Sequence, residues 1–152
     1  MTASELSAET TIAAPPATVW ALLSDLTQMP RWSPQVVRTV VRPAPTGLGS
    51  RMFNLNRQGA KRWPTTGKVV RFTPERDLAF RITENRTVWS FQLEPISDGG
   101  TRVVHRRETP HGISMLSKVL TKVALGGQEP FVAELQRGMA QTLSRVKATA
   151  EA

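Results

Sequence analysis

The chain has 152 residues, 39% of them hydrophobic and 21% charged, with a formal net charge of +8 at pH 7. This composition is typical of a single folded domain over residues 1–152 and excludes a disordered chain. No apolar run reaches the ~18 residues of a membrane-spanning helix. The absence of cysteine excludes disulfides, thiolate catalysis and sulfur-ligated metals, and no secretory leader pattern is visible, so a cytoplasmic protein is expected.

The N-terminal part predicts a short strand followed by a kinked helical segment. Alternating β-branched residues over Glu9–Ala13 indicate the strand. Two prolines then open a helix over Pro16–Leu26, whose apolar residues recur at helical spacing. Thr27 is expected to cap a second short turn that carries Trp32 before Pro34 ends it.

The middle of the chain alternates between apolar and polar residues with the period of β-strands. Short polar connections separate the runs, and Ser97–Gly100 contains the Asp-Gly-Gly signal of a tight hairpin. This pattern favours an antiparallel meander over β-α-β units. The six expected strands are Val36–Val41, Gly49–Arg57, Thr65–Thr73, Leu78–Thr83, Val88–Glu94 and Thr101–Thr109.

The C-terminal part returns to a helical period, which predicts a long helix over about residues 114–149. Gly126 and Gly127 each cost a helix roughly 1 kcal/mol relative to alanine, so we expect a break near residues 126–130. The half from Gln128 to Ala148 is expected to be the more stable. One helix is only ~10 Å across and cannot fill a strongly curved sheet, so a cavity is expected between them.

Several motifs along this order of elements resemble the START-like, or Bet v 1-like (SRPBCC), helix-grip superfamily. Within it they resemble the bacterial polyketide cyclase/dehydrase-like branch. The matching residues are Ile12–Pro16, Val19–Leu26, Pro30–Pro34, Gly49–Arg51, Phe80–Arg81, Asp98–Val103 and Gly138–Leu143. The resemblance implies an α+β helix-grip fold: a curved antiparallel sheet of six to seven strands wrapped on a long C-terminal helix, with two short helices between strands 1 and 2. It leaves the function open, because this superfamily includes cyclases, lipid carriers, hormone receptors and chaperone regulators.

Strand alternation identifies the residues expected to face the cavity. On the strand over residues 49–57, hydrophobicity alone favours Phe53 and Leu55 on the inner face. The resemblance instead favours Met52, Asn54 and Asn56 on that face, and we follow the resemblance. Trp32 is expected near the cavity mouth, as an aromatic gate or as a hydrophobic plug. The candidate ligand-binding residues are Trp32, Met52, Asn54, Asn56, Phe80, Trp89, Phe91, His105, Arg107, Phe131, Leu135 and Met139.

His105 and Arg107 form the one pair with evident chemical potential. A histidine that ionises near neutrality can move protons, and an arginine can hold a carboxylate or an enolate. The sequence favours binding of a hydrophobic or amphipathic small molecule, such as a lipid or a polyketide-like compound, over catalysis. The alternative is a cyclase or dehydratase-like lyase with His105 as acid/base and Arg107 as second candidate. Neither a metal nor a cofactor is expected.

A second alternative function is suggested by the basic middle of the chain. Between Arg51 and Arg86 there are nine basic residues and only three acidic ones. Trp63 lies among these charges and could stack on nucleic-acid bases. This pattern would suit binding of nucleic acid or of an acidic partner protein. The protein itself is expected to be either a monomer or a homodimer. The residues involved would be Arg57, Lys61, Arg62 and Lys68.

Overall fold

The computed structural model describes residues 5–109 and 128–152, and in the last helix its side chains from residue 132 onward. Seven strands form one antiparallel sheet in the order β1-β7-β6-β5-β4-β3-β2. Strands β2 to β7 follow one another as a meander, and β1 pairs with β7. The strands are β1 (Leu6–Ile12), β2 (Val36–Arg42), β3 (Arg51–Gln58), β4 (Lys61–Thr73), β5 (Asp77–Ile82), β6 (Val88–Pro95) and β7 (Thr101–Glu108).

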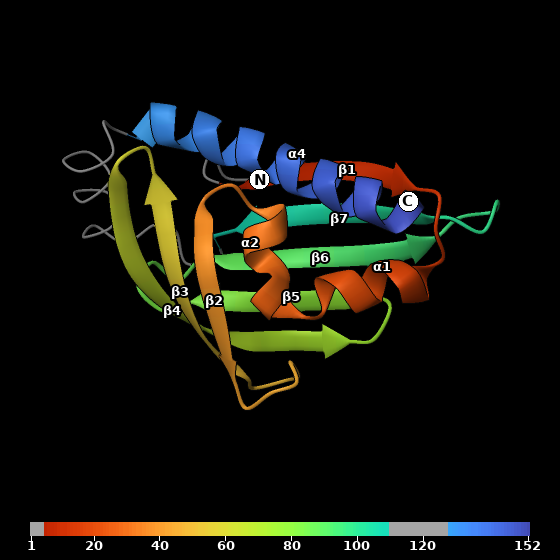
Figure 1. Cartoon of the computed structure of the whole chain (residues 1–152), viewed down its shortest axis with the longest axis horizontal. Coiled ribbons are helices and arrows are strands. Elements are labelled where there is room, and N and C mark those ends of the chain that lie inside the picture. Colours follow the sequence, from red (N-terminus) through yellow and green to blue (C-terminus); the bar gives the residue numbers. More distant parts are fainter. Residues whose placement is uncertain (1–4, 110–127) are drawn as a thin grey trace.

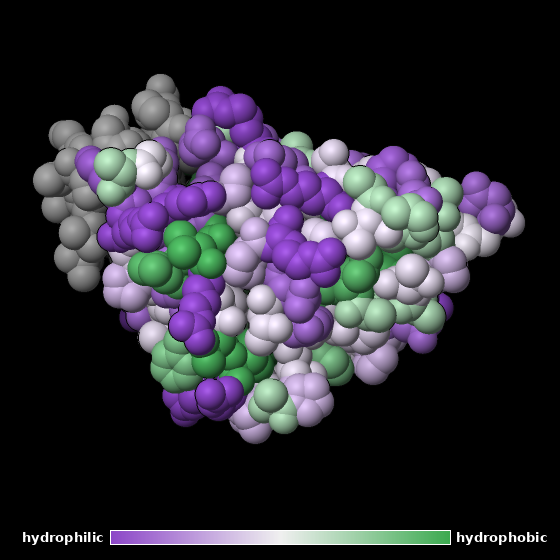
Figure 2. Space-filling view, viewed as in Figure 1, coloured by the Kyte–Doolittle hydropathy of each residue, from purple (hydrophilic) through white to green (hydrophobic). Residues whose placement is uncertain are grey.

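The helical elements lie on one side of the sheet (Figure 1). The long helix α4 (Gln128–Glu151) runs along β1, while the two short α-helices lie in front of the middle strands. Hydrophilic side chains cover much of the outer surface of α4 (Figure 2). The short elements between β1 and β2 are α1 (Pro16–Leu23), the 3-10 helix η1 (Leu26–Gln28) and α2 (Met29–Trp32).

The sheet is curved, so that β2, β3 and β4 bend away from the middle strands (Figure 1). The register shifts between Val36 and Arg38 on β2, and between Val69 and Arg71 on β4. Such irregularities bend a strand and increase its local twist. The curved antiparallel sheet, the long C-terminal helix and the two short helices after β1 confirm the expected helix-grip fold.

Several element boundaries differ from the expectation. Strand β4 starts at Lys61 rather than Thr65, because Gly59, with a φ of 61°, supplies the turn early. The capping residue of the second short helical segment is Asp25 rather than Thr27, since the Asp25 carboxylate accepts a hydrogen bond of 3.2 Å from the Thr27 N–H. The hairpin before β7 follows its sequence signal, with Gly99 at a φ of 86°.

Helix α4 matches the half of the C-terminal helix that was expected to be the more stable. The predicted part over 114–127 and the predicted break lie outside the described residues. Among residues 5–109 and 128–152, no helix is long and apolar enough to cross a lipid bilayer.

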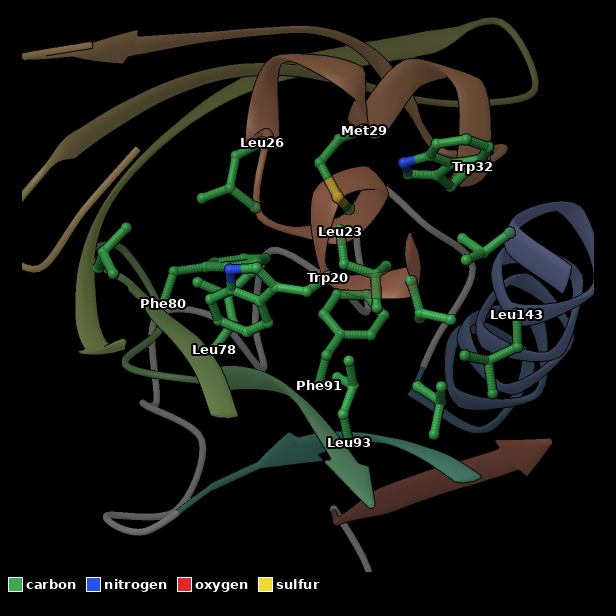
Figure 3. Packing of buried hydrophobic residues seen from close by; sticks show 14 of the residues in the cluster. Trp20, Leu23, Leu26, Met29, Trp32, Leu78, Phe80, Phe91, Leu93 and Leu143 are labelled. Atoms are coloured by element: carbon green, nitrogen blue, oxygen red, sulfur yellow. The ribbon is translucent and has the colours of Figure 1, made fainter. Parts of the chain in front are cut away.

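The short helices and α4 close one end of the sheet's concave side with a hydrophobic core. Figure 3 shows Leu23, Met29 and Trp32 pointing from the helical segment toward the sheet and toward Leu143 of α4. Phe91 of β6 is fully buried on the opposite wall. A second, smaller cluster of Leu6, Leu135 and Met139 lies farther along α4.

Candidate functional site

A cavity of about 120 Å³, partly open to solvent, lies between the concave face of the sheet, α2 and α4. A cavity of this size has room for several water molecules, which is more than packing defects usually leave. Its lining residues come from elements far apart in the chain. They are Met29, Ser33, Gln35, Val36, Thr39, Met52, Asn54, Asn56, Trp63, Thr65, Phe80, Ile82, Asn85, Trp89, His105, Arg107, Leu135, Gly138, Met139 and Thr142.

One wall of the cavity is polar and is built by hydrogen bonds across β2, β3 and β4. The Thr39 hydroxyl donates to Asn54 Oδ1 at 2.9 Å, and Asn54 Nδ2 donates to Thr65 Oγ1 at 3.3 Å. Asn56 Nδ2 donates to the same Thr65 oxygen at 2.9 Å. Strand register places Thr39, Asn54 and Thr65 directly opposite one another. The network holds the amides in fixed orientations, and Asn54 keeps a second N–H that no described residue accepts.

A second polar feature is His105 on β7, whose side chain is 3% exposed. Its Nδ1 lies 2.8 Å from the Ser90 carbonyl oxygen. A carbonyl can only accept, so Nδ1 carries the proton and Nε2 keeps the lone pair. The ring stacks on Phe91, with centroids 4.0 Å apart.

The expectation that His105 ionises near neutrality is wrong. Burial lowers the pKa of His105 from 6.5 to about 4, although the hydrogen bond to the Ser90 carbonyl acts in the opposite direction. The cause is the loss of hydration, which penalises the charged imidazolium. At neutral pH the ring is therefore a neutral hydrogen-bonding group that can act as a base or as an acceptor.

Arg107 lies two residues farther along β7 and is 3% exposed. Its guanidinium carbon lies 5.8 Å from the ring centroid of Trp89, within the range of a cation–π contact. Burial lowers the pKa of Arg107 from its usual value to about 10, which still leaves the group charged at neutral pH. The cavity therefore contains a permanent cation in its wall.

The remaining wall is apolar. Met52, Phe80 and Trp89 come from the sheet, and Leu135 and Met139 come from α4. A Cβ atom at Gly138 would lie 2.5 Å from the Gln35 amide oxygen. Glycine at this position thus leaves room for the Gln35 amide, whose Nε2 donates to the Glu134 carbonyl at 3.2 Å. The cavity as a whole is amphipathic, with a cation and amides on some strands and apolar side chains on the others.

Nine of the predicted ligand-binding residues line the cavity, and their role in binding stays a prediction. They are Met52, Asn54, Asn56, Phe80, Trp89, His105, Arg107, Leu135 and Met139. Phe53 is 49% exposed while Met52 is 1% exposed, so the face of β3 indicated by the resemblance is the inner one.

Trp32 and Phe91 do not line the cavity. Trp32 is 2% exposed and packs in the core between the short helices and α4, in the position of a plug rather than a gate (Figure 3). Phe91 is covered by the His105 ring that stacks on it. The side chain of Phe131 lies outside those that the structure describes.

Several lining residues were missed by the sequence analysis, above all Trp63 and Thr65 of β4 and Thr39 of β2. Trp63 precedes the strand expected over Thr65–Thr73, whereas β4 begins at Lys61 and includes it. Once β4 starts at Lys61, alternation places Trp63 and Thr65 on the inner face together. The signal was present in the period of the strand. Contacts from Gln35, Gly138 and Thr142 depend on how α4 docks, which strand alternation cannot indicate.

The same strand alternation places several basic residues in the middle of the chain and Trp63 on different faces of the sheet. Arg57, Arg62 and Lys68 are exposed, whereas Trp63 lies in the cavity wall on the other face. These three cations and Trp63 therefore lie on opposite faces of the sheet, and nucleic-acid binding stays a prediction. Within the described residues, no group of three or more His, Cys, Asp or Glu side chains could hold a metal ion.

A curved antiparallel sheet that holds a long C-terminal helix, with a cavity between them, defines a helix-grip protein. Residues 4–151 match the family described as Polyketide cyclase / dehydrase and lipid transport. The chain therefore belongs to this family. No curated protein sequence is significantly similar to it.

Solved structures share the fold at low sequence identity. The ZhuI aromatase/cyclase from Streptomyces sp. R1128 is 18% identical with a TM-score of 0.75, over 97% of this chain and 93% of that one. The major latex-like protein 151 from Panax ginseng is 11% identical with a TM-score of 0.68, over 96% of each chain. The protein TTHA0849 from Thermus thermophilus is 23% identical with a TM-score of 0.65, over 96% of each chain. These similarities support the fold.

Proposed function

We propose that the protein binds an amphipathic small molecule, lipid-like or polyketide-like, in the cavity between the sheet and α4. The observation that carries this proposal is the amphipathic lining: a buried cation and fixed amides on some strands, and apolar side chains on the others. Membership of a family whose description includes both cyclases and lipid transport is consistent with this assignment.

The apolar part of the ligand would contact Phe80, Trp89 and Met139. Each Å² of apolar surface removed from water contributes about 25 cal/mol, so apolar burial would supply most of the affinity. The polar part would contact Arg107 or Asn54. A carboxylate or carbonyl oxygen suits both, because Arg107 is charged and Asn54 has an N–H available.

The first experiment is native mass spectrometry of freshly purified protein. A retained ligand would appear as a mass above that of the chain, and extraction would identify it. In parallel, a fluorescent fatty acid should bind the purified protein. If the protein retains no ligand and also fails to bind the probe, the proposal is contradicted.

Substitutions then locate the binding site. Phe80→Asp or Trp89→Asp places a charge in the apolar wall and should weaken probe binding about tenfold or more, because a buried carboxylate without a partner is costly. Phe53→Asp is the matched control, since Phe53 is 49% exposed on the other face of the sheet. Equal loss in Phe53→Asp would show that the probe binds elsewhere.

Tryptophan emission offers a second measurement. Trp63 and Trp89 line the cavity, whereas Trp20 and Trp32 lie in the hydrophobic core. A cavity ligand should therefore change the emission of the protein, and most of that change should disappear in a Trp63→Phe, Trp89→Phe double variant. A change that persists in this variant would exclude the cavity as the binding site.

A second candidate function is a cyclase or dehydratase-type reaction with His105 as the base. The observation that favours it is the neutral ring, with Nδ1–H held by the Ser90 carbonyl and Nε2 unprotonated. Once a substrate is identified, His105→Ala should abolish turnover and leave ligand affinity near that of the wild type. Unchanged turnover would remove His105 from the mechanism.

A further inference from the structure

The convex face of the sheet carries a row of four basic residues on four adjacent strands. Arg42 of β2 is directly opposite Arg51 of β3, Arg51 is opposite Lys68 of β4, and Lys68 is opposite Arg81 of β5. All four side chains are exposed. Adjacent strands lie about 4.8 Å apart, so the row extends over roughly 14 Å.

An apolar strip lies beside this row. Val40 is opposite Phe53, and Leu55 is opposite Pro64. Phe53 is 49% exposed, and Leu48, in the loop that joins β2 to β3, is 71% exposed. These two are the exposed large hydrophobic residues among those that the structure describes.

Further cations surround the strip. Arg57 and Arg62 are opposite each other near the β3–β4 turn and border the strip on its other side, while Arg38, opposite Leu55, lies at its edge on β2. We call the whole surface the basic–apolar face. It consists of Arg38, Val40, Arg42, Arg51, Phe53, Leu55, Arg57, Arg62, Pro64, Lys68 and Arg81. Figure 2 shows hydrophobic and hydrophilic clusters alternating over the region where β2 and β3 lie in Figure 1.

No cation of this face forms an ion pair with a described residue. Glu84 lies beside this face, and its two carboxylate oxygens accept hydrogen bonds from the N–H and the hydroxyl of Thr66, the residue opposite Phe53. The other half of the sheet is different, since Arg71 pairs with Asp77 and with Glu108. The charges are thus balanced on one half of the convex face and left unbalanced on the other.

Like charges directly opposite each other on neighbouring strands destabilise a sheet. A row of four such charges is therefore a cost to the fold unless an external anion offsets it. The exposed Phe53 and Leu48 add apolar surface that this anion-bearing partner would cover.

We propose that the basic–apolar face docks the protein on an anionic lipid surface. Exposed apolar residues bordered by arginine and lysine are the combination that interfacial membrane binding requires, because acyl chains accept the former and anionic headgroups the latter. Single-stranded nucleic acid fits less well, since it binds through stacked aromatics and Phe53 is the single aromatic residue in this set. The proposal goes beyond ligand binding and does not depend on it, because the cavity lies on the opposite face.

The test is co-sedimentation of the full chain with vesicles. The protein should bind vesicles of phosphatidylcholine mixed with phosphatidylglycerol, should not bind vesicles of phosphatidylcholine alone, and should dissociate as salt is raised. Arg51→Glu should weaken binding to the anionic vesicles about tenfold or more, because it reverses one charge at the surface. Phe53→Asp should weaken it similarly.

Arg76→Glu is the matched control, because Arg76 is an exposed arginine in the β4–β5 turn and lies outside the basic–apolar face. It should bind as the wild type does. Equal loss in Arg76→Glu and Arg51→Glu would overturn the proposal, since binding would then follow net charge alone. Equal binding to neutral vesicles would also overturn it.

Two further measurements separate the alternatives. Binding of a single-stranded RNA oligonucleotide without binding to anionic vesicles would overturn the proposal and assign this face to nucleic acid. Phe53→Asp should keep the fluorescent fatty-acid binding that Phe80→Asp loses, whereas Phe80→Asp should keep vesicle binding. Failure of the docking proposal would therefore be distinguishable from failure of the proposed ligand binding.

Discussion

The imidazole ring of His105 lies flat against the phenyl ring of Phe91, with centroids 4.0 Å apart and ring planes 1° apart. The register of β6 and β7 produces this pair, because Phe91 and His105 are directly opposite each other. The pair places a titratable group inside the protein, where protonation is costly.

We predict that His105 makes the protein less stable in mild acid. The pKa of His105 is about 4 in the folded protein and 6.5 in the unfolded chain. Between these values the unfolded chain binds a proton that the folded protein does not, so unfolding is favoured as pH falls from 6.5 toward 4. At pH 4.5 the loss should reach about 2–3 kcal/mol relative to pH 7.5. Urea unfolding at the two pH values measures it.

A His105→Gln variant controls for the carboxylates that also titrate in acid. Glutamine keeps an N–H that can donate to the Ser90 carbonyl but does not ionise in this range. The difference in stability between the two pH values should therefore be smaller in the variant. The same pH dependence in both proteins would show that His105 is not the group responsible.

Trp32 should stabilise the fold through its volume and not through its N–H. Its Nε1 is buried with no hydrogen-bond partner among the described residues. Trp32→Phe removes that unpaired donor and should cost under about 1.5 kcal/mol, whereas Trp32→Ala should cost about 3–5 kcal/mol because it leaves a large void. Denaturant unfolding of both variants checks this, and equal losses would indicate that Nε1 has a partner.

The polar wall of the cavity should behave as one coupled unit. Thr39→Val leaves Asn54 Oδ1 without the hydroxyl that now donates to it, and should cost about 1–3 kcal/mol. Asn54→Leu removes both groups that need partners at this position. In a double-mutant cycle, the Thr39→Val, Asn54→Leu protein should lose less stability than the sum of the two single variants. Additive losses would show that the hydrogen bond between the two side chains contributes little.

Much of the fold could be predicted because periodicity is a local property. Alternation over Leu78–Thr83 and Val88–Glu94 identified two strands and their buried faces, and Asp-Gly-Gly identified the hairpin before β7. The inner face of β3 was different. Asn54 faces inward while Phe53 is exposed, so hydrophobicity alone would have reversed the strand, and the family resemblance decided the assignment correctly.

The parts that could not be predicted depend on tertiary contacts. The pKa of His105 follows from how closely Phe91 and the rest of the interior exclude water, which a single strand does not reveal. The plug position of Trp32 depends on where α4 crosses the short helices. The row from Arg42 to Arg81 required the register of four strands, because these residues are far apart in the sequence.

The basic–apolar face should carry a measurable cost in stability. Arg51 lies between Arg42 and Lys68, so Arg51→Glu replaces two repulsive cross-strand pairs with two attractive ones. At low ionic strength the variant should be more stable than the wild type by about 0.5–1 kcal/mol, and the gain should shrink at high salt as the charges are screened. Thermal unfolding at low and high salt measures this difference. An Arg51→Glu protein that is less stable at low salt would mean that Arg51 has favourable interactions that outweigh the repulsion. A stable variant that no longer binds anionic vesicles would show that the face is retained at the expense of stability.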